Sequence, residues 1–461
     1  MPSRLVTRGL AFALSLSLQS APVLADSANQ QGKSPTSSVT AGQAIKDGQE
    51  QGVLPLNELR TFADVFDRIK QAYVEEVDDK TLLENAVKGM LTELDPHSAY
   101  LQPDAYKDLQ INTTGEFGGL GIEVGMEDGY VKVITPIDDT PAAKAGVMAG
   151  DLIVKIGNTQ VKGLSLSEAV KHMRGKPGTD IVLTVVREGI DKPLEISVTR
   201  AVIQVQSVKQ RMLAPDFGYI RLSQFQVHTG QDMEKAINHL IKKNKRPLKG
   251  IVLDLRNNPG GVLQAAVDVS DLLLEEGLVV YTKGRLADSQ MKFSATPGDM
   301  LDRMPVVVLI NGGSASASEI VAGALQDHKR AVIMGTTSFG KGSVQTVLPL
   351  HNNRALKITT ARYYTPDGRS IQAQGIEPDI VVENAKLTKL KYGSFAKEAD
   401  LSGHLANPDE DGNNADKQPH AGSGKKPLEE TDYQLYEALN LLKALNVVSS
   451  YSKSVQATQN Q

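Results

Sequence analysis

The chain has 461 residues, of which 40% are hydrophobic, and this length allows about three domains with real cores. Its formal net charge at pH 7 is −4, so the strongly basic surface of nucleic-acid-binding proteins is not indicated. The absence of cysteine excludes disulfides, cysteine-based metal sites and thiol nucleophiles.

The N-terminus has the features of an export signal. Arg4 and Arg8 precede an apolar segment over residues 10–18, and Val23-Leu24-Ala25 offers the small residues of a cleavage site. This pattern predicts a secretory signal peptide that is cut after Ala25. The apolar segment is too short to serve as a permanent membrane anchor. An exported chain without cysteines fits an oxidising compartment, so we expect a periplasmic location.

The next residues predict a linker and then a helical segment. Residues 26–55 are rich in Gln, Ser, Gly and Thr, which is typical of a flexible linker. Between Leu59 and Tyr73 large apolar residues recur at helical spacing, and a second helix is expected over residues 80–94. Two short amphipathic helices bury little apolar surface alone. They therefore need a partner, either the main body of the protein or another subunit.

Residues 112–200 combine glycine-rich turns with short strands. A Gly-Gly-Leu-Gly turn at 118–121 leads into a strand, a helix is expected over 167–173, and an alternating strand follows at 181–187. This order of elements resembles a PDZ domain.

The resemblance implies that the glycine-rich turn captures the terminal carboxylate of a polypeptide, while the strand after it pairs with the peptide. The residues concerned are Gly118, Gly119, Leu120, Gly121 and Ile122. An ordinary hairpin turn has the same composition and is the alternative. Arg174, at the end of the module's second helix, is either a solvated side chain or a regulatory contact to the neighbouring domain that senses peptide binding.

From residue 201 to residue 390 strands and helices alternate. Buried strands are expected at 218–222, 250–255 and 306–310, with helices at 230–243 and 262–274. Repeated strand–helix–strand units predict a sheet with parallel pairs, whose strand ends are the usual place for functional sites. The fold class is therefore α/β (α+β) and multidomain, with the PDZ-like module and helical segments at both ends.

A turn of small residues at 311–316 joins the strand at 306–310 to a helix expected over 317–327. The turn carries Ser314 and Ser316, and Ser318 follows in the first helical turn. A serine at a helix N-terminus lies near free backbone N–H groups, which can stabilise an oxyanion. A neighbouring glycine-rich turn at 257–261 can supply a second N–H. The alternative is structural, because Ser-Ala-Ser-Glu at 316–319 is also a capping box.

A serine nucleophile needs a base, and none of the eight histidines lies in a recognisable triad motif. Lys341, between two glycines, can act as a base if an apolar pocket keeps its amine neutral. Gln345 lies four residues further on, and this even spacing places both side chains on one face of a strand. The Gln345 amide can then orient the Lys341 amine. The alternative is an exposed loop lysine, which is the commoner case.

The segment at 335–341 also imitates a phosphate-binding loop. Gly342 stands where that motif requires Ser or Thr, and strand-like residues follow instead of a helix. Nucleotide hydrolysis is therefore disfavoured.

The composition changes after residue 390. The polar, charged stretch within 391–430 predicts a disordered linker. A final amphipathic helix presents Leu435, Leu439, Leu442 and Leu445, and it too needs a partner surface.

The order of these segments resembles the carboxyl-terminal processing proteases over about residues 56–385. Two motifs carry the resemblance: Asn-Gly-Gly-Ser-Ala-Ser-Ala-Ser-Glu from Asn311 and Phe-Gly-Lys-Gly-x-x-Gln from Phe339. The resemblance implies that Ser316 is the nucleophile, Lys341 the general base and Gln345 the assisting residue. It also implies that the oxyanion donors are the backbone N–H groups of Gly260 or Gly261 and of Ala317.

The same resemblance implies a serine endopeptidase that needs no metal or other cofactor. Its expected substrates are proteins recognised by their C-terminal tails, including peptidoglycan hydrolases of the cell envelope. Homo-oligomers built through the terminal helices and a helical-repeat adaptor protein are the further partners it implies, and no nucleic acid is expected. The alternative is a catalytically silent PDZ scaffold of the envelope.

The predicted organisation follows from these observations. It consists of a signal peptide (1–25), a flexible linker (26–55), an N-terminal helical segment (56–111), a PDZ domain (112–200), a protease core (201–390), a disordered linker (391–430) and a C-terminal helix and tail (431–461).

Overall fold

The computed structural model describes residues 55–137, 139–387, 397–398, 401–405 and 428–459. The predicted signal peptide, nearly all of the linker at 26–55 and most of the linker at 391–430 lie outside the described residues. The chain divides into two compact units, residues 1–76 and residues 77–461. In the first unit, α1 (Leu56–Ala72) has no buried residue. Within the described ranges, no helix combines the length and the apolar character that crossing a membrane requires.

The second unit begins with α2 (Asp79–Thr92), β1 (Ala99–Leu101) and α3 (Pro103–Thr114). The carboxylate of Asp78 accepts a hydrogen bond from the Thr81 N–H and caps α2. Strand β1 pairs antiparallel with β18 (Arg354–Tyr364) of the main body. The Arg354 guanidinium fixes this contact by donating to the Tyr100 hydroxyl at 2.8 Å and to the Glu84 carboxylate at 2.6 Å. The second predicted helix thus has the main body as its partner.

A small β module follows α3. Its sheet has the order β3-β4-β5-β7-β8, with β6 paired to β5, while β2 and β9 form a separate ribbon. Its core is apolar and continuous, and α5 contributes Ala169 and Met173 to it. The elements are β2 (Glu116–Gly119), β3 (Ile122–Glu127), β4 (Tyr130–Pro136), α4 (Pro141–Lys144), β5 (Leu152–Ile156), β6 (Thr159–Gln160), α5 (Leu166–Met173), β7 (Asp180–Val186), β8 (Leu194–Thr199) and β9 (Ala201–Gln204).

The largest core is built on a six-stranded sheet of order β10-β11-β12-β15-β16-β19. Strands β11 to β19 are parallel in this order and β10 is antiparallel, which confirms the predicted parallel pairs. The strands and their helices are β10 (Val208–Ala214), β11 (Phe217–Leu222), α6 (Thr229–Asn244), β12 (Gly250–Asp254), α7 (Leu263–Asp271), β15 (Val306–Ile310), α8 (Ala317–Asp327), β16 (Val332–Gly335) and β19 (Ile380–Val381).

Helices cover both faces of this sheet, which explains why every residue of β15 is apolar. Val306, Val308 and Ile310 belong to the same hydrophobic cluster as α6, α7 and α8. The alternate residues Val307 and Leu309 belong to the cluster on the other face. Side chains of a strand alternate between faces, so a strand covered on both sides has no polar face.

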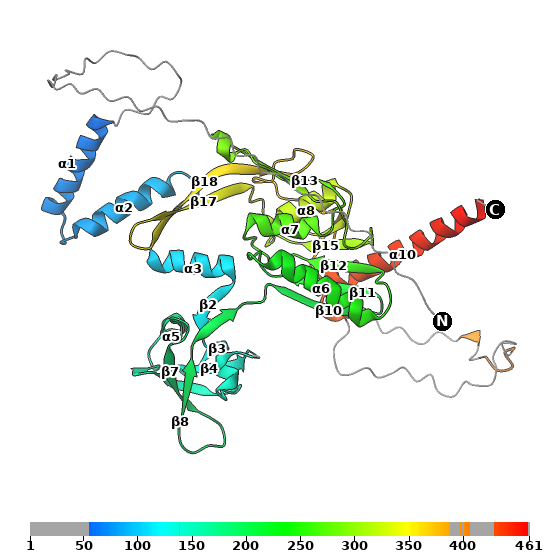
Figure 1. Cartoon of the computed structure of the whole chain (residues 1–461), viewed down its shortest axis with the longest axis horizontal. Helices are drawn as coiled ribbons and strands as arrows, with labels where there is room; N and C mark the ends of the chain where they lie inside the picture. The colour runs from blue at the N-terminus through cyan, green and yellow to red at the C-terminus, as the bar shows by residue number, and fades with distance from the viewer. Residues whose placement is uncertain (1–54, 138, 388–396, 399–400, 406–427, 460–461) are drawn as a thin grey trace, which may run out of the picture. The chain divides into compact units, whose positions relative to one another are not determined.

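The C-terminal helix α10 (Tyr433–Gln459) covers the second face (Figure 1). Leu435, Leu439 and Leu442 are buried there against β12 and β15. The partner surface that its sequence requires is therefore this chain's own sheet. A short helix, α9 (Leu428–Thr431), precedes it.

A second sheet carries a long hairpin of β17 (Ser343–Leu350) and β18. On its other edge β18 pairs with β1 and with β13 (Gly277–Gly284), which in turn pairs with β14 (Lys292–Ala295). A single 3-10 turn, η1 (Ala287–Ser289), lies between β13 and β14. This sheet brings the segment before the small module next to the segment that follows Lys341.

Candidate active site

The three serines at the junction of β15 and α8 lie in different environments. The Ser314 hydroxyl donates to the carbonyl of Leu255 at 2.8 Å, and the Ser318 hydroxyl donates to the carbonyl of Asn258 at 2.9 Å. Both side chains are fully buried and hold the two glycine-rich turns together. The Ser316 hydroxyl makes no such bond to a backbone carbonyl of the described residues, so it takes no part in joining the two turns.

The backbone of Ser316 is strained. Its φ of 54° and ψ of −111° lie in a region that residues with a side chain rarely adopt. It is the N-cap residue of α8 and is 8% exposed. The phenol of Tyr363 lies against it: burial raises the pKa of Tyr363 to about 12, while its hydrogen bond with the Ser316 side chain acts in the opposite direction. A strained residue at a helix N-terminus is the geometry of a serine nucleophile.

The turn after β12 closes on this serine. Gly260 (φ 97°) and Gly261 (φ 145°) have backbone angles suited to glycine. A Cβ atom on Gly260 would lie 2.8 Å from the Cβ of Ser316 and 3.0 Å from the N of Ala317, so the two backbones are in contact.

The available donors in this contact can be identified. The Gly260 N–H donates to Asn258 Oδ1 at 3.0 Å and is already used. The N–H groups of Gly261 and Ala317 have no acceptor within the described parts of the chain. The geometry therefore favours Gly261 over Gly260 as the donor that accompanies Ala317.

Glu319 connects the serine to the lysine. This fully buried carboxylate accepts from the Ser316 N–H at 2.7 Å and from the Lys341 N–H at 2.9 Å through Oε2. Through Oε1 it accepts from the Ser338 hydroxyl and the Gly340 N–H, both at 2.6 Å. The capping glutamate thus fixes the backbone of both candidate catalytic residues, which the capping box alone did not predict.

The environment of Lys341 favours a neutral amine. Burial lowers the pKa of Lys341, and the positive charge of Lys357 lowers it further, against the opposing effect of Glu319 and Asp95. A lysine with a lowered pKa can accept a proton near neutral pH. Within the described residues no hydrogen bond joins Lys341 Nζ to Ser316 Oγ.

The predicted relation between Lys341 and Gln345 needs correction. Strand β17 begins at Ser343, so Lys341 lies before the strand, and the alternation of side chains along a strand does not extend to it. The register shift opposite Val344 and Gln345 places one extra residue, Thr360, in β18 and leaves β17 regular there. Instead the Gln345 amide donates to the Ser343 hydroxyl at 2.8 Å and to Thr359 Oγ1 at 3.4 Å.

Comparison with known proteins decides the family. Residues 216–382 match the model of peptidase family S41, residues 118–198 match the PDZ domain, and residues 19–105 match the N-terminal domain of the activating protease CtpB. A carboxy-terminal-processing protease of Bartonella bacilliformis is 51% identical over 411 residues, which cover 88% of this chain and 92% of the relative. The chain belongs to the carboxy-terminal processing proteases. It is a serine protease of family S41 with a PDZ domain.

The chain is also similar to other curated proteins and solved structures. A carboxyl-terminal-processing protease of Synechocystis is 39% identical over 305 residues, covering 65% of this chain and 70% of that protein. Among solved structures, a photosystem II D1 C-terminal processing protease is 31% identical, with a TM-score of 0.42, and the match covers 71% of this chain and 93% of that one.

In the PDZ domain of this protease, the residues of the predicted glycine-rich turn belong partly to strand β2 and partly to the turn that follows it. Gly118 and Gly119 lie in β2 and pair with β9, and a Cβ atom on Gly118 would lie 2.0 Å from the carbonyl oxygen of Gly175. Leu120 and Gly121 form the turn itself, and their N–H groups have no acceptor among the residues that the structure describes. Ile122 begins β3, the edge strand of the PDZ sheet. The turn and the edge strand thus offer the donors that a tail peptide requires.

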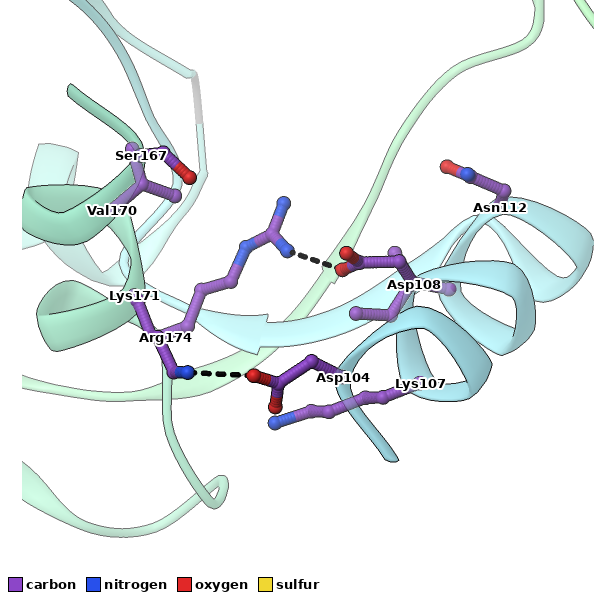
Figure 2. Close-up of a pocket in the computed structure, with 9 residues that line it drawn as sticks. Asp104, Lys107, Asp108, Asn112, Ser167, Val170, Lys171 and Arg174 are labelled. Carbon is purple, nitrogen blue, oxygen red and sulfur yellow. Dashed lines mark hydrogen bonds and ion pairs between the residues drawn. The ribbon is translucent and has the colours of Figure 1, made fainter. Parts of the chain in front are cut away.

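Arg174 lies in the PDZ domain and faces α3. Its guanidinium pairs with Asp108 at 3.4 Å and lies 4.9 Å from the ring centre of Phe117. Next to it, Lys171 pairs with Asp104 at 2.7 Å. Figure 2 shows both basic side chains reaching across a pocket of about 520 Å³ toward the acidic residues of α3. The neighbouring element that Arg174 contacts is therefore α3.

Sequence reasoning missed three residues around the catalytic centre. Tyr363 is far from Ser316 along the chain and carries no motif. Asp95 and His97, in the turn before β1, interact electrostatically with Lys341. Burial lowers the pKa of His97, and the positive charge of Lys341 lowers it further. The negative charge of Asp95 raises the pKa of Lys341. The sequence treats Asp95-Pro96 only as a helix end, and His97 lacks the partners of a triad motif.

Proposed function

We propose that this protease is a periplasmic endopeptidase in which Ser316 and Lys341 form the catalytic dyad. The observation that carries the proposal is the Glu319 carboxylate, which joins the strained Ser316 backbone to the backbone of a half-buried lysine with a lowered pKa. The periplasmic location rests on the predicted signal peptide.

The proposed reaction uses these groups in a fixed order. Ser316 Oγ attacks the peptide carbonyl while neutral Lys341 accepts its proton, and the N–H groups of Gly261 and Ala317 stabilise the oxyanion. Lys341 then returns the proton to the leaving amine, which departs from the acyl-enzyme. Water, deprotonated by Lys341, hydrolyses the ester and restores Ser316. Gln345 assists by orienting the amine, which requires its amide to leave Ser343.

Substrate selection is assigned to the PDZ domain. The free N–H groups of Leu120 and Gly121 and the open edge of β3 suit the C-terminal tail of a protein substrate. Peptidoglycan hydrolases of the cell envelope are the proposed substrates, delivered by a helical-repeat adaptor. A homo-oligomer is proposed through the N-terminal helix, since α1 has no buried residue and presents Leu59, Phe62 and Val65 to solvent, whereas the apolar face of α10 already packs on this chain's own sheet.

Cleavage of an unfolded test protein by residues 26–461, followed on a gel beside the Ser316→Ala variant, tests the proposed activity. We expect the parent to cleave and the variant to be silent. If neither cleaves, the assay is repeated with envelope extract, because a protease that a partner activates would be silent on its own. Continued silence of the parent would leave the PDZ scaffold as the better description.

Arg174 is proposed to transmit tail binding to the core through α3. The basic pair on α5 and the acidic pair on α3 hold the two helices together, and a bound tail would change the position of α5. We expect a tail peptide to stimulate cleavage by the parent and to stimulate Arg174→Gln several-fold less, at unchanged peptide affinity. Equal stimulation of both proteins would show that Arg174 is only a solvated side chain.

A further inference from the structure

The turn at residues 95–98, between α2 and β1, is joined to the catalytic strand by hydrogen bonds. Asp95 Oδ1 accepts from the N–H groups of His97 at 2.8 Å and of Ser98 at 2.9 Å. Asp95 Oδ2 accepts from the Ser98 hydroxyl at 2.6 Å. One carboxylate thus fixes the backbone of the turn and the orientation of the hydroxyl.

The Ser98 hydroxyl in turn holds β18 at one residue. It accepts the backbone N–H of Thr359 at 3.2 Å. Thr359 lies directly opposite Gln345 in the β17–β18 ladder, and its Oγ1 accepts from the Gln345 amide at 3.4 Å. A continuous series of contacts therefore leads from Asp95 through Ser98 and Thr359 to Gln345.

Both ends of the turn are held in place. After it, β1 pairs with β18 from Ala99 to Leu101. Before it, Glu84 of α2 bonds to the Arg354 guanidinium, which also binds the Tyr100 hydroxyl. Ser98 is 7% exposed. A turn that is fixed on both sides and buries its serine can hold a neighbouring strand in position, whereas a mobile loop cannot.

The charges around the turn are consistent with this role. Although burial acts in the opposite direction, hydrogen bonds from Ser98, His97 and Thr359 hold the pKa of Asp95 below its usual value, so the carboxylate stays ionised. Burial and the positive charge of Lys341 lower the pKa of His97. The turn thus contributes two groups to the surroundings of Lys341. One is the ionised Asp95 carboxylate, whose oxygens already accept hydrogen bonds, and the other is the neutral imidazole of His97.

We propose that Asp95 and Ser98 are positioning residues of the catalytic centre, which fix Thr359 of β18 and through it the position on β17 from which the Gln345 side chain turns to Lys341 in the proposed mechanism. This inference rests on the proposed function, in which Lys341 is the base and Gln345 assists it. It gives the segment before the PDZ domain a part in the chemistry of the core.

A double-mutant cycle tests the proposal with the protein from residue 26 onward and a fluorescently labelled unfolded protein as substrate, under the conditions in which the parent cleaves. We expect Ser98→Ala to lower kcat by about 10- to 100-fold, a range typical of misplaced catalytic groups, with KM and tail-peptide affinity unchanged. Ser98→Thr, which keeps the hydroxyl, should recover most of the loss. In the Gln345→Ala background, Ser98→Ala should cause almost no further loss, because both changes remove the same assistance.

Two further variants keep the test decisive. Thr359→Val preserves shape and the N–H to Ser98 but removes Oγ1, and it should reproduce the loss in kcat even if Ser98→Ala folds poorly. Ser270→Ala is the matched control, since Ser270 is another buried serine, whose hydroxyl donates to the carbonyl of Ala266 at 2.8 Å in α7. Its kcat should equal that of the parent.

The outcomes separate this inference from the proposed function. Parent-like kcat in both Ser98→Ala and Thr359→Val, or losses that multiply with that of Gln345→Ala, would overturn the positioning role. A fully active Gln345→Ala variant would remove it as well, because Gln345 would then give no assistance to fix. The dyad itself is judged independently by Lys341→Ala, whose full activity would refute the proposed mechanism whatever the turn does.

Discussion

The Lys341→Ala variant is expected to lose about 10²–10⁴-fold in the rate of peptide cleavage while binding a tail peptide as tightly as the parent. The reason is that the half-buried Lys341 amine, whose pKa is lowered, is the proposed base, whereas the proposed donors for the tail carboxylate lie in the PDZ domain. The measurement is single-turnover cleavage of an unfolded protein beside a peptide-binding titration. Retained activity in this variant would eliminate the dyad mechanism.

Lys341→Arg separates a proton acceptor from a positive charge. Arginine keeps the charge but cannot lose its proton in a protein, so this variant should be as inactive as Lys341→Ala. If arginine restored cleavage, the lysine would act by its charge and another residue would have to be the base.

The pH dependence follows from the same amine. Because only the neutral amine can accept the proton of Ser316, kcat/KM should rise with pH and level off above the lowered pKa of Lys341. Lys357 is one of the groups that lower this pKa, so Lys357→Gln should move the rise to higher pH. A shift to lower pH would contradict the assignment.

The fold was largely predictable because its strongest signals are local. The run at 306–310 is apolar at every position, and a strand covered on both faces requires that composition. The helix over 317–327 has the predicted limits. The partner of the C-terminal helix was not predictable, because an apolar stripe shows that a helix is buried without showing what covers it. Here the sheet of the same chain buries Leu435, Leu439 and Leu442.

The site was predictable only in part, for two physical reasons. Side-chain alternation holds only within a strand, and β17 begins at Ser343, so the spacing argument does not reach Lys341. Contacts made through sheet pairing also leave no mark in local sequence. Asp95 and Ser98 reach the catalytic strand only because β1 pairs with β18.

The Glu319→Gln variant is expected to lose both stability and catalysis. The Glu319 carboxylate accepts four hydrogen bonds in a fully buried site, from Ser316, Ser338, Gly340 and Lys341. A glutamine places an NH₂ group where one oxygen accepts two of these donors. Each buried donor that loses its acceptor costs about 1–3 kcal/mol, so for the two donors we expect about 2–6 kcal/mol less stability in urea unfolding. The cleavage rate should fall at least about 100-fold, because the backbones of the nucleophile and the base lose their common anchor.

The PDZ domain supplies the matched control for this variant. Ser165 and Glu168 form a second capping box, at the start of α5, where the Ser165 N–H donates to the Glu168 carboxylate at 2.8 Å. Glu168 is exposed, and glutamine is also accepted at this position of a capping box, so Glu168→Gln should change stability and cleavage little. Comparable losses in both variants would mean that Glu319 acts only as a helix cap. A stable, active Glu319→Gln protein would mean that its four bonds are not what holds Ser316 and Lys341 in place. A loss confined to Glu319→Gln, with tail-peptide binding intact, would show that one buried carboxylate organises both halves of the dyad.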